Sequence, residues 1–246
     1  MLLRLHNCTY AYKPWNRPVL HGLDYTLAPG LTVLLGPNGA GKSTLLRLVA
    51  STMAPRTGTI TLGNLTAGSG AYRRAVAWMP QQITAMTGLT AREQVAYTGW
   101  LKGMNRRDAW DASIRALARV DLTEQADSKA RHLSDGQLRR VGVASALIHD
   151  ARVLLLDEPT AGMDPQQRRM FRDVLGSLTG EVHVLLSTHD VTDLAEESDH
   201  VTVLDEGRVI YNGGTAAFLA HAPPDVAPGR VAEAAYTALS ARQFTI

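Results

Sequence analysis

The sequence predicts an α/β fold in which helices cover a buried sheet. The main observation is a set of short, mainly aliphatic runs at 31–35, 153–156 and 182–187, which end at glycine or at polar residues. Runs of this length are typical of buried strands, whereas the longer segments between them repeat apolar residues at helical spacing. The composition agrees, since 45% of the 246 residues are hydrophobic and 20% are charged, as in an ordinary globular protein.

Charge, cysteine content and hydropathy exclude several classes of protein. The net charge of +2 comes from interspersed basic and acidic residues without a long basic run, so no nucleic-acid partner is expected. Cys8 is the one cysteine, which excludes an internal disulfide, and we expect it in the core of the first strand. No apolar stretch approaches the ~20 residues of a membrane-spanning helix, which predicts a cytosolic protein unless a partner holds it at a membrane.

The N-terminal region predicts an antiparallel pair of strands at residues 2–10 and 23–27. The region between them carries three aromatic residues, Tyr10, Tyr12 and Trp15. Any of these rings can stack on a purine, and the alternative for each is packing in the core or in a turn.

A glycine-rich stretch follows the strand predicted at 31–35 and precedes a helix predicted at 43–51. Its spacing, G-x-x-x-x-G-K-[ST], indicates a phosphate-binding loop when it lies between a strand and a helix. The glycines let backbone N–H groups turn toward a polyphosphate, and the helix start adds its positive dipole end. Lys42 then reaches the β- and γ-phosphates, and the Ser43 hydroxyl ligates Mg²⁺. The predicted nucleotide-binding residues of the loop are Gly36, Pro37, Asn38, Gly39, Ala40, Gly41, Lys42, Ser43 and Thr44.

The region from about residue 89 to 130 is predicted to be a mostly helical insert. Thr90 and Glu93 form a capping box at the start of its first helix. The second helix has an apolar stripe through Trp110, Ile114, Leu117 and Ala118.

Residues 133–137, Leu-Ser-Asp-Gly-Gln, introduce the next helix. Ser134 and Asp135 are good N-cap residues, which explains both without any function. Gly136 in the first turn indicates instead that a ligand or another backbone approaches closely.

Two carboxylates end the aliphatic run at 153–156. In open parallel sheets, ligands bind outside the carboxyl ends of the strands. Asp157 is therefore placed to hold Mg²⁺, and Glu158 to orient or deprotonate a water molecule. The alternative is that both acids only terminate the strand, which is less favoured in a chain with a phosphate-binding loop.

Gln81 and His189 also follow predicted strands. Gln81 comes after the strand at 76–79, which Pro80 halts, and it is either a functional amide or solvated polar filler. His189 opens onto a helix and either caps it or contacts phosphate. Asp164 is predicted to be the N-cap of another helix.

The C-terminal third predicts a β-hairpin and two helices. Strands at 201–204 and 209–211 flank Glu206 and Gly207, a hairpin turn signal. One short helix and a final helix at about 231–242 follow.

With all these pieces in one order, the sequence resembles the nucleotide-binding subunit of an ABC transporter. The decisive stretch is 133–137, which is similar to the LSGGQ signature of that family. The resemblance covers residues 1–215 and implies a P-loop ATPase core, a mixed sheet flanked by helices, with an antiparallel β subdomain. It also implies a helical subdomain at about 82–150, and residues 216–246 are then a short helical extension.

The resemblance implies a role for each ambiguous position in ATP binding and hydrolysis. Tyr12 matches the aromatic residue that stacks on adenine, and 36–44 match the Walker A motif. Glu158 matches the catalytic base, and Asp157 the Walker B aspartate. The implied catalytic set is Lys42, Gln81, Glu158 and His189, and the implied Mg²⁺ set is Ser43, Gln81 and Asp157.

In this family two ATP molecules are held between two cassettes that dimerise head to tail. Ser134, Asp135, Gly136 and Gln137 of one cassette would then complete the ATP site of the other, a second copy or a homologous ATPase subunit. Asp164 matches the D-loop. Asp135 replaces the usual first glycine of the signature, and Ala161 stands where the D-loop commonly has serine.

The resemblance also implies a separate membrane subunit that holds the protein at the cytoplasmic side of the membrane. Its docking surface would lie on the helical insert beside Gln81, with Tyr97 and Trp100 assigned to the insert's own core. The final helix favours export over import. The alternative is a soluble ABC ATPase that acts in assembly without a membrane partner, whereas the stretch at 133–137 argues against a phosphate-loop kinase.

Overall fold

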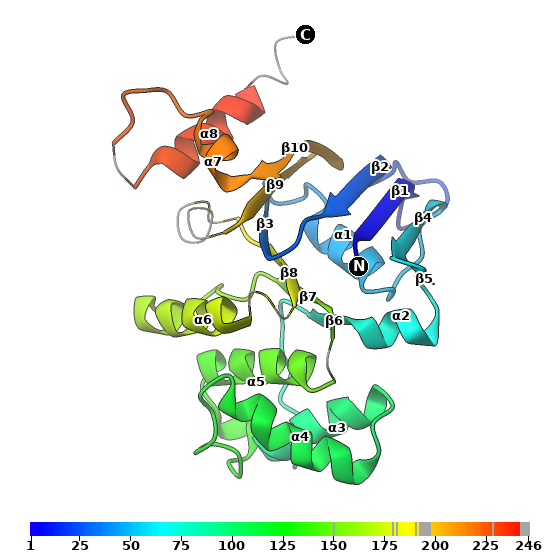
Figure 1. Cartoon of the computed structure of the whole chain (residues 1–246), viewed down its shortest axis with the longest axis vertical. Helices are drawn as coiled ribbons and strands as arrows, with labels where there is room; N and C mark the ends of the chain where they lie inside the picture. The colour runs from blue at the N-terminus through cyan, green and yellow to red at the C-terminus, as the bar shows by residue number, and fades with distance from the viewer. Residues whose placement is uncertain are drawn as a thin grey trace. The chain divides into compact units, whose positions relative to one another are not determined.

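The computed structural model describes residues 1–149, 151–178, 180, 182–189, 191, 198–227 and 229–241. The chain forms two compact units (Figure 1). The first unit joins Met1–Tyr72 to His183–Ile246, and the second unit is Arg73–Val182. Each unit carries a different part of the predicted site. The predicted domain boundaries at 82–150 and 215 remain predictions.

The first unit contains a four-stranded antiparallel sheet in the order β2-β1-β4-β5. Leu3 pairs with Leu27 on one neighbouring strand and with Leu62 on the other, so the predicted antiparallel pair is confirmed. Cys8 is fully buried in the first strand, also as predicted. The strands are β1 (Leu3–Tyr10), β2 (Leu20–Leu27), β4 (Thr57–Leu62) and β5 (Leu65–Thr66).

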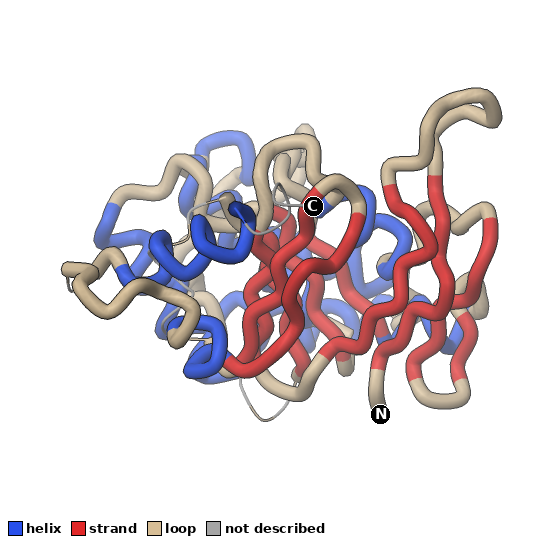
Figure 2. The backbone as a smooth tube through the Cα atoms, turned by 90° about the horizontal axis from the view of Figure 1, so that it is seen from above, coloured by secondary structure: helices blue, strands red, loops and turns tan. Residues whose placement is uncertain are grey.

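A second, mixed sheet in the same unit carries the phosphate-binding loop. In it β3 is parallel to both β8 and β9, and β9 and β10 form the predicted antiparallel hairpin. Every residue of β3 is buried, which is why this strand appears in the sequence as an unbroken apolar run. The strands, drawn red in Figure 2, are β3 (Leu31–Leu35), β8 (His183–Ser187), β9 (His200–Asp205) and β10 (Arg208–Gly214).

In the described part of this unit, the helices that accompany the sheets are α1 (Lys42–Val49), α7 (Thr215–Leu219) and α8 (Val231–Ala241). The hairpin turn lies against the phosphate-binding loop, since the Gly207 N–H donates to the Ala40 carbonyl at 3.0 Å. Glu206 and Gly207 have φ angles of 42° and 73°, the two positive values that a type I′ hairpin turn requires. The predicted end of the last helix at Arg242 lies outside the described residues.

The second unit contains one parallel pair of strands and a group of helices. Met79 of β6 is paired with Leu156 of β7, so the carboxyl ends of the two strands lie side by side. α2 (Gly70–Ala75) leads into this unit. Its other elements are β6 (Val76–Met79), α3 (Ala91–Leu101), α4 (Arg106–Ala118), the 3₁₀ turn Ala130–His132, α5 (Asp135–Leu147), β7 (Val153–Asp157) and α6 (Pro165–Leu178).

The apolar stripe predicted on α4 is wrong in part. Trp110 is 41% exposed, and the Arg92 guanidinium lies over its ring, with the guanidinium carbon 3.9 Å from the ring centroid. The small residues of α4 are buried instead, because they permit close packing against α3 and α5. They are Ala109, Ala112, Ser113 and Ala116, together with Leu117.

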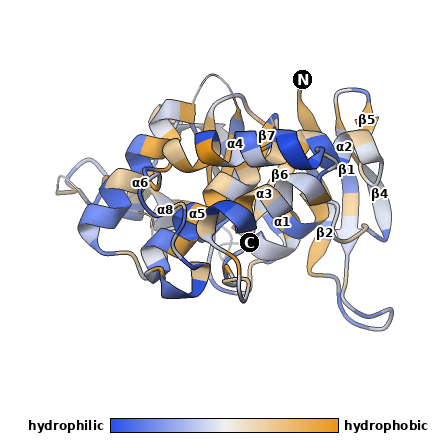
Figure 3. Ribbon diagram, turned by 90° about the horizontal axis from the view of Figure 1, so that it is seen from below, coloured by the Kyte–Doolittle hydropathy of each residue, from blue (hydrophilic) through white to orange (hydrophobic). Residues whose placement is uncertain are grey.

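Polar and apolar residues are mixed along the helices (Figure 3). Among the described residues, no helix is both long enough and apolar enough to cross a membrane.

Candidate ATP-binding and hydrolysis site

The phosphate-binding loop joins the end of β3 to the start of α1. Gly39 and Gly41 have φ angles of 87° and 105°, in the left-handed region that glycine adopts without strain. A side chain at Gly36 would have its Cβ 2.2 Å from the Leu204 carbonyl oxygen, so only glycine fits there. The loop therefore has the glycine-dependent shape that presents backbone N–H groups at a helix start.

Lys42 lies at the first position of α1 and is 6% exposed. Its Nζ donates to the Gly36 carbonyl at 2.6 Å and to the Pro37 carbonyl at 3.1 Å. These bonds hold the ammonium group against the loop itself. A phosphate bound by the loop would therefore lie beside a fixed positive charge.

Tyr12 is joined to the same loop and helix. Its hydroxyl lies 2.8 Å from the Thr44 Oγ1 atom, and its ring packs edge-on against Tyr10 with the centroids 5.3 Å apart. Tyr12 is 52% exposed, so part of its ring remains accessible for stacking. Trp15 is 79% exposed, and the Lys13 ammonium group lies 6.0 Å from the centroid of its ring. The predicted contact of Tyr12 with a base remains a prediction.

His189 follows β8 in the first unit and is exposed. The preceding residue, Thr188, donates its N–H to the Leu34 carbonyl at 3.1 Å, two residues before the loop begins at Gly36. His189 therefore lies near the start of the phosphate-binding loop. Its predicted contact with phosphate remains a prediction.

The second unit brings Gln81 and Glu158 together. They follow the neighbouring strands β6 and β7, and the Gln81 Nε2 donates to the Glu158 Oε2 at 2.9 Å. Asp157, the last residue of β7, is 3% exposed. Glu158 has a φ angle of 46°, which is uncommon outside glycine and marks a sharp turn at the end of the strand.

One residue of this cluster was missed by sequence reasoning. Arg139 of α5 donates through one guanidinium nitrogen to the carbonyls of Gln81 and Glu158, at 3.2 Å each. The sequence contains no signal for these bonds, because both acceptors are backbone oxygens and any residue type supplies them.

The 133–137 stretch forms the start of α5, as predicted. Ser134 and Gln137 make a reciprocal capping box. The Gln137 N–H donates to the Ser134 hydroxyl at 3.2 Å, and the Ser134 N–H donates to the Gln137 side-chain oxygen at 2.9 Å. Gly136 is buried, and a Cβ there would meet the side-chain amide of Gln167 of α6 at 2.7 Å. Within the chain, the close neighbour of Gly136 is thus a side chain, whereas the sequence suggested a ligand or another backbone segment. Asp135 is exposed.

Asp164 begins α6 as predicted. Its Oδ1 accepts the Gln167 N–H at 2.8 Å, which is an N-cap bond. This bond fixes the first turn of α6, and the Gln167 side chain of the same turn is the one that lies against Gly136.

Tyr97 and Trp100 do not lie in the core of the helical insert, so that prediction is wrong. They are 41% and 51% exposed. The buried face of α3 consists of Ala91, Gln94, Val95 and Gly99. A Cβ at Gly99 would lie 2.9 Å from Ile148 and from Met104, so this face packs too tightly for aromatic rings.

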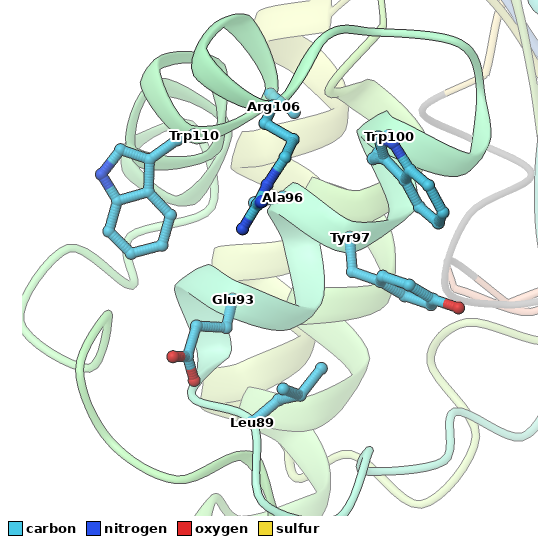
Figure 4. A pocket seen from close by; sticks show the side chains of 8 residues that line it. Leu89, Glu93, Ala96, Tyr97, Trp100, Arg106 and Trp110 are labelled. Carbon is cyan, nitrogen blue, oxygen red and sulfur yellow. The ribbon is translucent and has the colours of Figure 1, made fainter.

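The exposed rings line a pocket of about 600 Å³ on α3 and α4 (Figure 4). Glu93 also lines it, and the hydrogen bond from the Thr90 N–H holds the pKa of its carboxyl below the usual range. The lining residues are Leu89, Glu93, Ala96, Tyr97, Trp100, Arg106, Ala109 and Trp110.

Comparison with known proteins agrees with this geometry. A family model described as "ABC transporter" matches residues 20–161. A putative ABC transporter ATP-binding protein of Streptomyces coelicolor is 36% identical over 222 residues, which cover 88% of this chain and 84% of that protein.

Two further relatives carry functional names. The linearmycin resistance ATP-binding protein of Bacillus subtilis is 31% identical over 217 residues, covering 86% of this chain and 69% of that protein. The Nod factor export ATP-binding protein I of Rhizobium meliloti is 36% identical over 202 residues, covering 80% of this chain but 60% of that protein.

Among solved structures, a dimeric ATP-binding cassette in a post-hydrolysis state with ADP and Pi has a TM-score of 0.76. It is 24% identical, and the match covers 87% of this chain and 98% of that one. The likeness confirms the α/β fold predicted from the sequence. Together with the family match over residues 20–161, these relatives show that the chain belongs to the ABC transporter family, as an ATP-binding ATPase domain.

Proposed function

We propose that the chain binds and hydrolyses MgATP in a head-to-tail dimer and thereby drives transport through a separate membrane subunit. The observation that carries this proposal is the pairing of Gln81 with Glu158 at the ends of two parallel strands, in a chain that also holds a phosphate-binding loop. An amide beside a carboxylate at such a strand end suits the control of a water molecule.

In the proposed site, the loop at 36–44 binds the triphosphate and Lys42 neutralises its β- and γ-phosphates. Tyr12 stacks on adenine, because its ring is accessible while its hydroxyl is held at Thr44. His189 contacts the γ-phosphate. The short distances from the Lys42 ammonium group to the loop carbonyls support this arrangement, since they hold that group against the loop.

Mg²⁺ is assigned to Ser43, Gln81 and Asp157. All three supply oxygen ligands, which Mg²⁺ prefers, and Asp157 is a buried carboxylate at a strand end. Within the described part of the chain, no group of three or more His, Cys, Asp and Glu side chains could hold a metal ion. The proposed set of Ser43, Gln81 and Asp157 suits Mg²⁺ as NTPases bind it, because that ion takes few protein ligands and completes its shell with phosphate oxygens and water. When bound, the ion would neutralise charge that develops on the phosphates.

Glu158 is the proposed general base. Its carboxylate takes a proton from water, the water oxygen forms a bond to the γ-phosphorus, and the bond from that phosphorus to the bridging oxygen of ADP breaks. Gln81 donates to the Glu158 carboxylate and holds it in place, which suits a group that must act in one orientation.

The stretch at 133–137 is assigned to the ATP of the partner cassette. Ser134 and Asp135 are exposed at the start of α5, so this helix start can approach a phosphate of another molecule. Gly136 and Gln137 complete the proposed contact, and Asp164 belongs to the same interface as the D-loop.

The aromatic pocket on α3 and α4 is the proposed docking site of the membrane subunit. Exposed tryptophan and tyrosine rings around a pocket are typical of protein interfaces. The name of one relative, an export ATP-binding protein, favours export over import. The membrane subunit would hold the chain at the cytoplasmic side of the membrane.

The test is a pull-down of tagged Glu158→Gln protein from native membranes with MgATP, followed by identification of what is captured. We expect a polytopic membrane protein. Trp100→Ala should reduce its capture, whereas Leu101→Ala should not, because Leu101 is 60% exposed on the same helix but does not line the pocket. Capture of soluble proteins alone would contradict transport and leave the soluble assembly ATPase as the better account.

A further inference from the structure

Hydrogen bonds link Arg139, Gln81 and Glu158 to one another in a closed ring. The Arg139 guanidinium donates to the Gln81 carbonyl and to the Glu158 carbonyl, at 3.2 Å each. The Gln81 side chain in turn donates to the Glu158 carboxylate at 2.9 Å. Three hydrogen bonds therefore join two strand ends and the helix α5 in one unit of the chain.

The Glu158 backbone needs such support. A φ angle of 46° is uncommon for a residue other than glycine, and the following residue is Pro159, which restricts Glu158 further. A conformation of this kind persists only where its surroundings hold it. The Glu158 carbonyl accepts the Ala161 N–H at 3.3 Å as well as the Arg139 guanidinium, so two donors hold this peptide group.

We infer that Arg139 is a positioning residue for ATP hydrolysis: it holds the backbone of Gln81 and Glu158 so that the amide and the carboxylate face each other. This inference rests on the proposed function of those two side chains. Arg139 lies two residues after Gln137, so its guanidinium also ties the start of α5 to the hydrolysis residues of the same chain. A movement of the helix start would thus be transmitted to Glu158.

The chain offers a matched control in the next residue. Arg140 also donates to two backbone carbonyls through one guanidinium nitrogen, those of Val120 and Asp121, at 3.0 Å each. It fastens α5 to the end of α4 and touches neither Gln81 nor Glu158 in these contacts. Removing either arginine deletes two hydrogen bonds to backbone carbonyls, and removing Arg140 also deletes an ion pair with the Asp121 carboxylate at 3.8 Å. Only Arg139 bonds to the proposed hydrolysis residues.

The experiment compares Arg139→Gln, Arg139→Lys and Arg140→Gln in the purified chain. We expect Arg139→Gln to lower kcat roughly 10- to 100-fold, the effect of losing hydrogen bonds from a charged donor, while ATP affinity stays within about twofold. Arg139→Lys should recover part of kcat, because its ammonium group still donates to a carbonyl. Arg140→Gln should lower the melting temperature and leave the kcat of the folded protein near that of the parent.

Two outcomes would overturn the inference. In one, Arg139→Gln has the kcat of the parent while Glu158→Gln is inactive. Arg139 is then not a positioning residue, but the proposed function of Glu158 stands. In the other, Arg139→Gln and Arg140→Gln lower melting temperature and kcat alike, which makes both residues merely structural. Normal turnover by Glu158→Gln would instead contradict the proposed function itself.

Discussion

At the scale of single residues, Lys42 illustrates how a buried charge is tolerated before a ligand arrives. Lys42 is 6% exposed, and its ammonium group donates to two carbonyls of its own loop, which offsets part of the lost hydration. A polyphosphate offers charged oxygens in place of neutral carbonyls, so the ammonium group gains a partner of opposite charge as well as a hydrogen-bond acceptor.

Lys42→Ala should therefore weaken ATP binding, by about 1.5–3 kcal/mol as for a lost hydrogen bond to a charged group. The measurement is a titration of purified protein with a fluorescent ATP analogue. Lys129→Ala is the control, because its exposed ammonium group donates to the Gly88 carbonyl and belongs to the second unit, whereas the loop belongs to the first. Unchanged affinity in Lys42→Ala would contradict the assignment of the phosphate-binding loop.

The position of a single residue was predictable where a local sequence motif fixes the backbone around it. Lys42 and Glu158 follow from the loop spacing and from a strand end, both of which are local patterns. Arg139 was not predictable, because its acceptors are backbone atoms far away in sequence. Tyr97 and Trp100 were assigned wrongly, because apolar character alone does not show that small residues already fill the packed face of α3.

At the scale of elements, the strands were the most predictable part of the fold. β3 and β7 are buried along their whole length, so each appears in the sequence as a continuous apolar run. The capping box at Thr90 and Glu93 is also confirmed, because its bonds are local. The buried face of α4 was not predictable in full, since two helical stripes compete and the one with smaller side chains packs inward.

The contact between α5 and α6 supplies a prediction about Gly136. A Cβ at this position would collide with the end of the flexible Gln167 side chain, which can move aside, so Gly136→Ala should fold. If the glycine is needed for the ATP of a partner cassette, turnover should still fall roughly tenfold or more, because the added methyl group displaces a charge-assisted contact to phosphate.

The double variant Gly136→Ala with Gln167→Ala separates the two explanations by measurement of ATP turnover. Trimming Gln167 removes the collision within the chain but leaves the methyl group at the start of α5. Turnover that stays low supports the role across the dimer. Turnover restored to that of Gln167→Ala alone would show that Gly136 serves only the packing of α5 on α6.

At the scale of the whole molecule, the predicted site is distributed over both units of the chain. The phosphate-binding loop, Tyr12 and His189 belong to the first unit, and Gln81, Asp157, Glu158 and the 133–137 stretch belong to the second. The order of these motifs was visible in the sequence, and the family match confirms the fold class that they predicted. Their assembly around ATP, within one chain and between two, remains the proposal.

Sedimentation velocity of the Glu158→Gln protein with MgATP, and separately with MgADP, tests this proposal most directly. The substitution removes the proposed base while leaving the loop and the 133–137 stretch intact, so ATP should stay bound between two cassettes. We expect a dimer with MgATP and a monomer with MgADP. A monomer with both nucleotides, or a dimer with both, would contradict the claim that ATP joins two copies of this cassette.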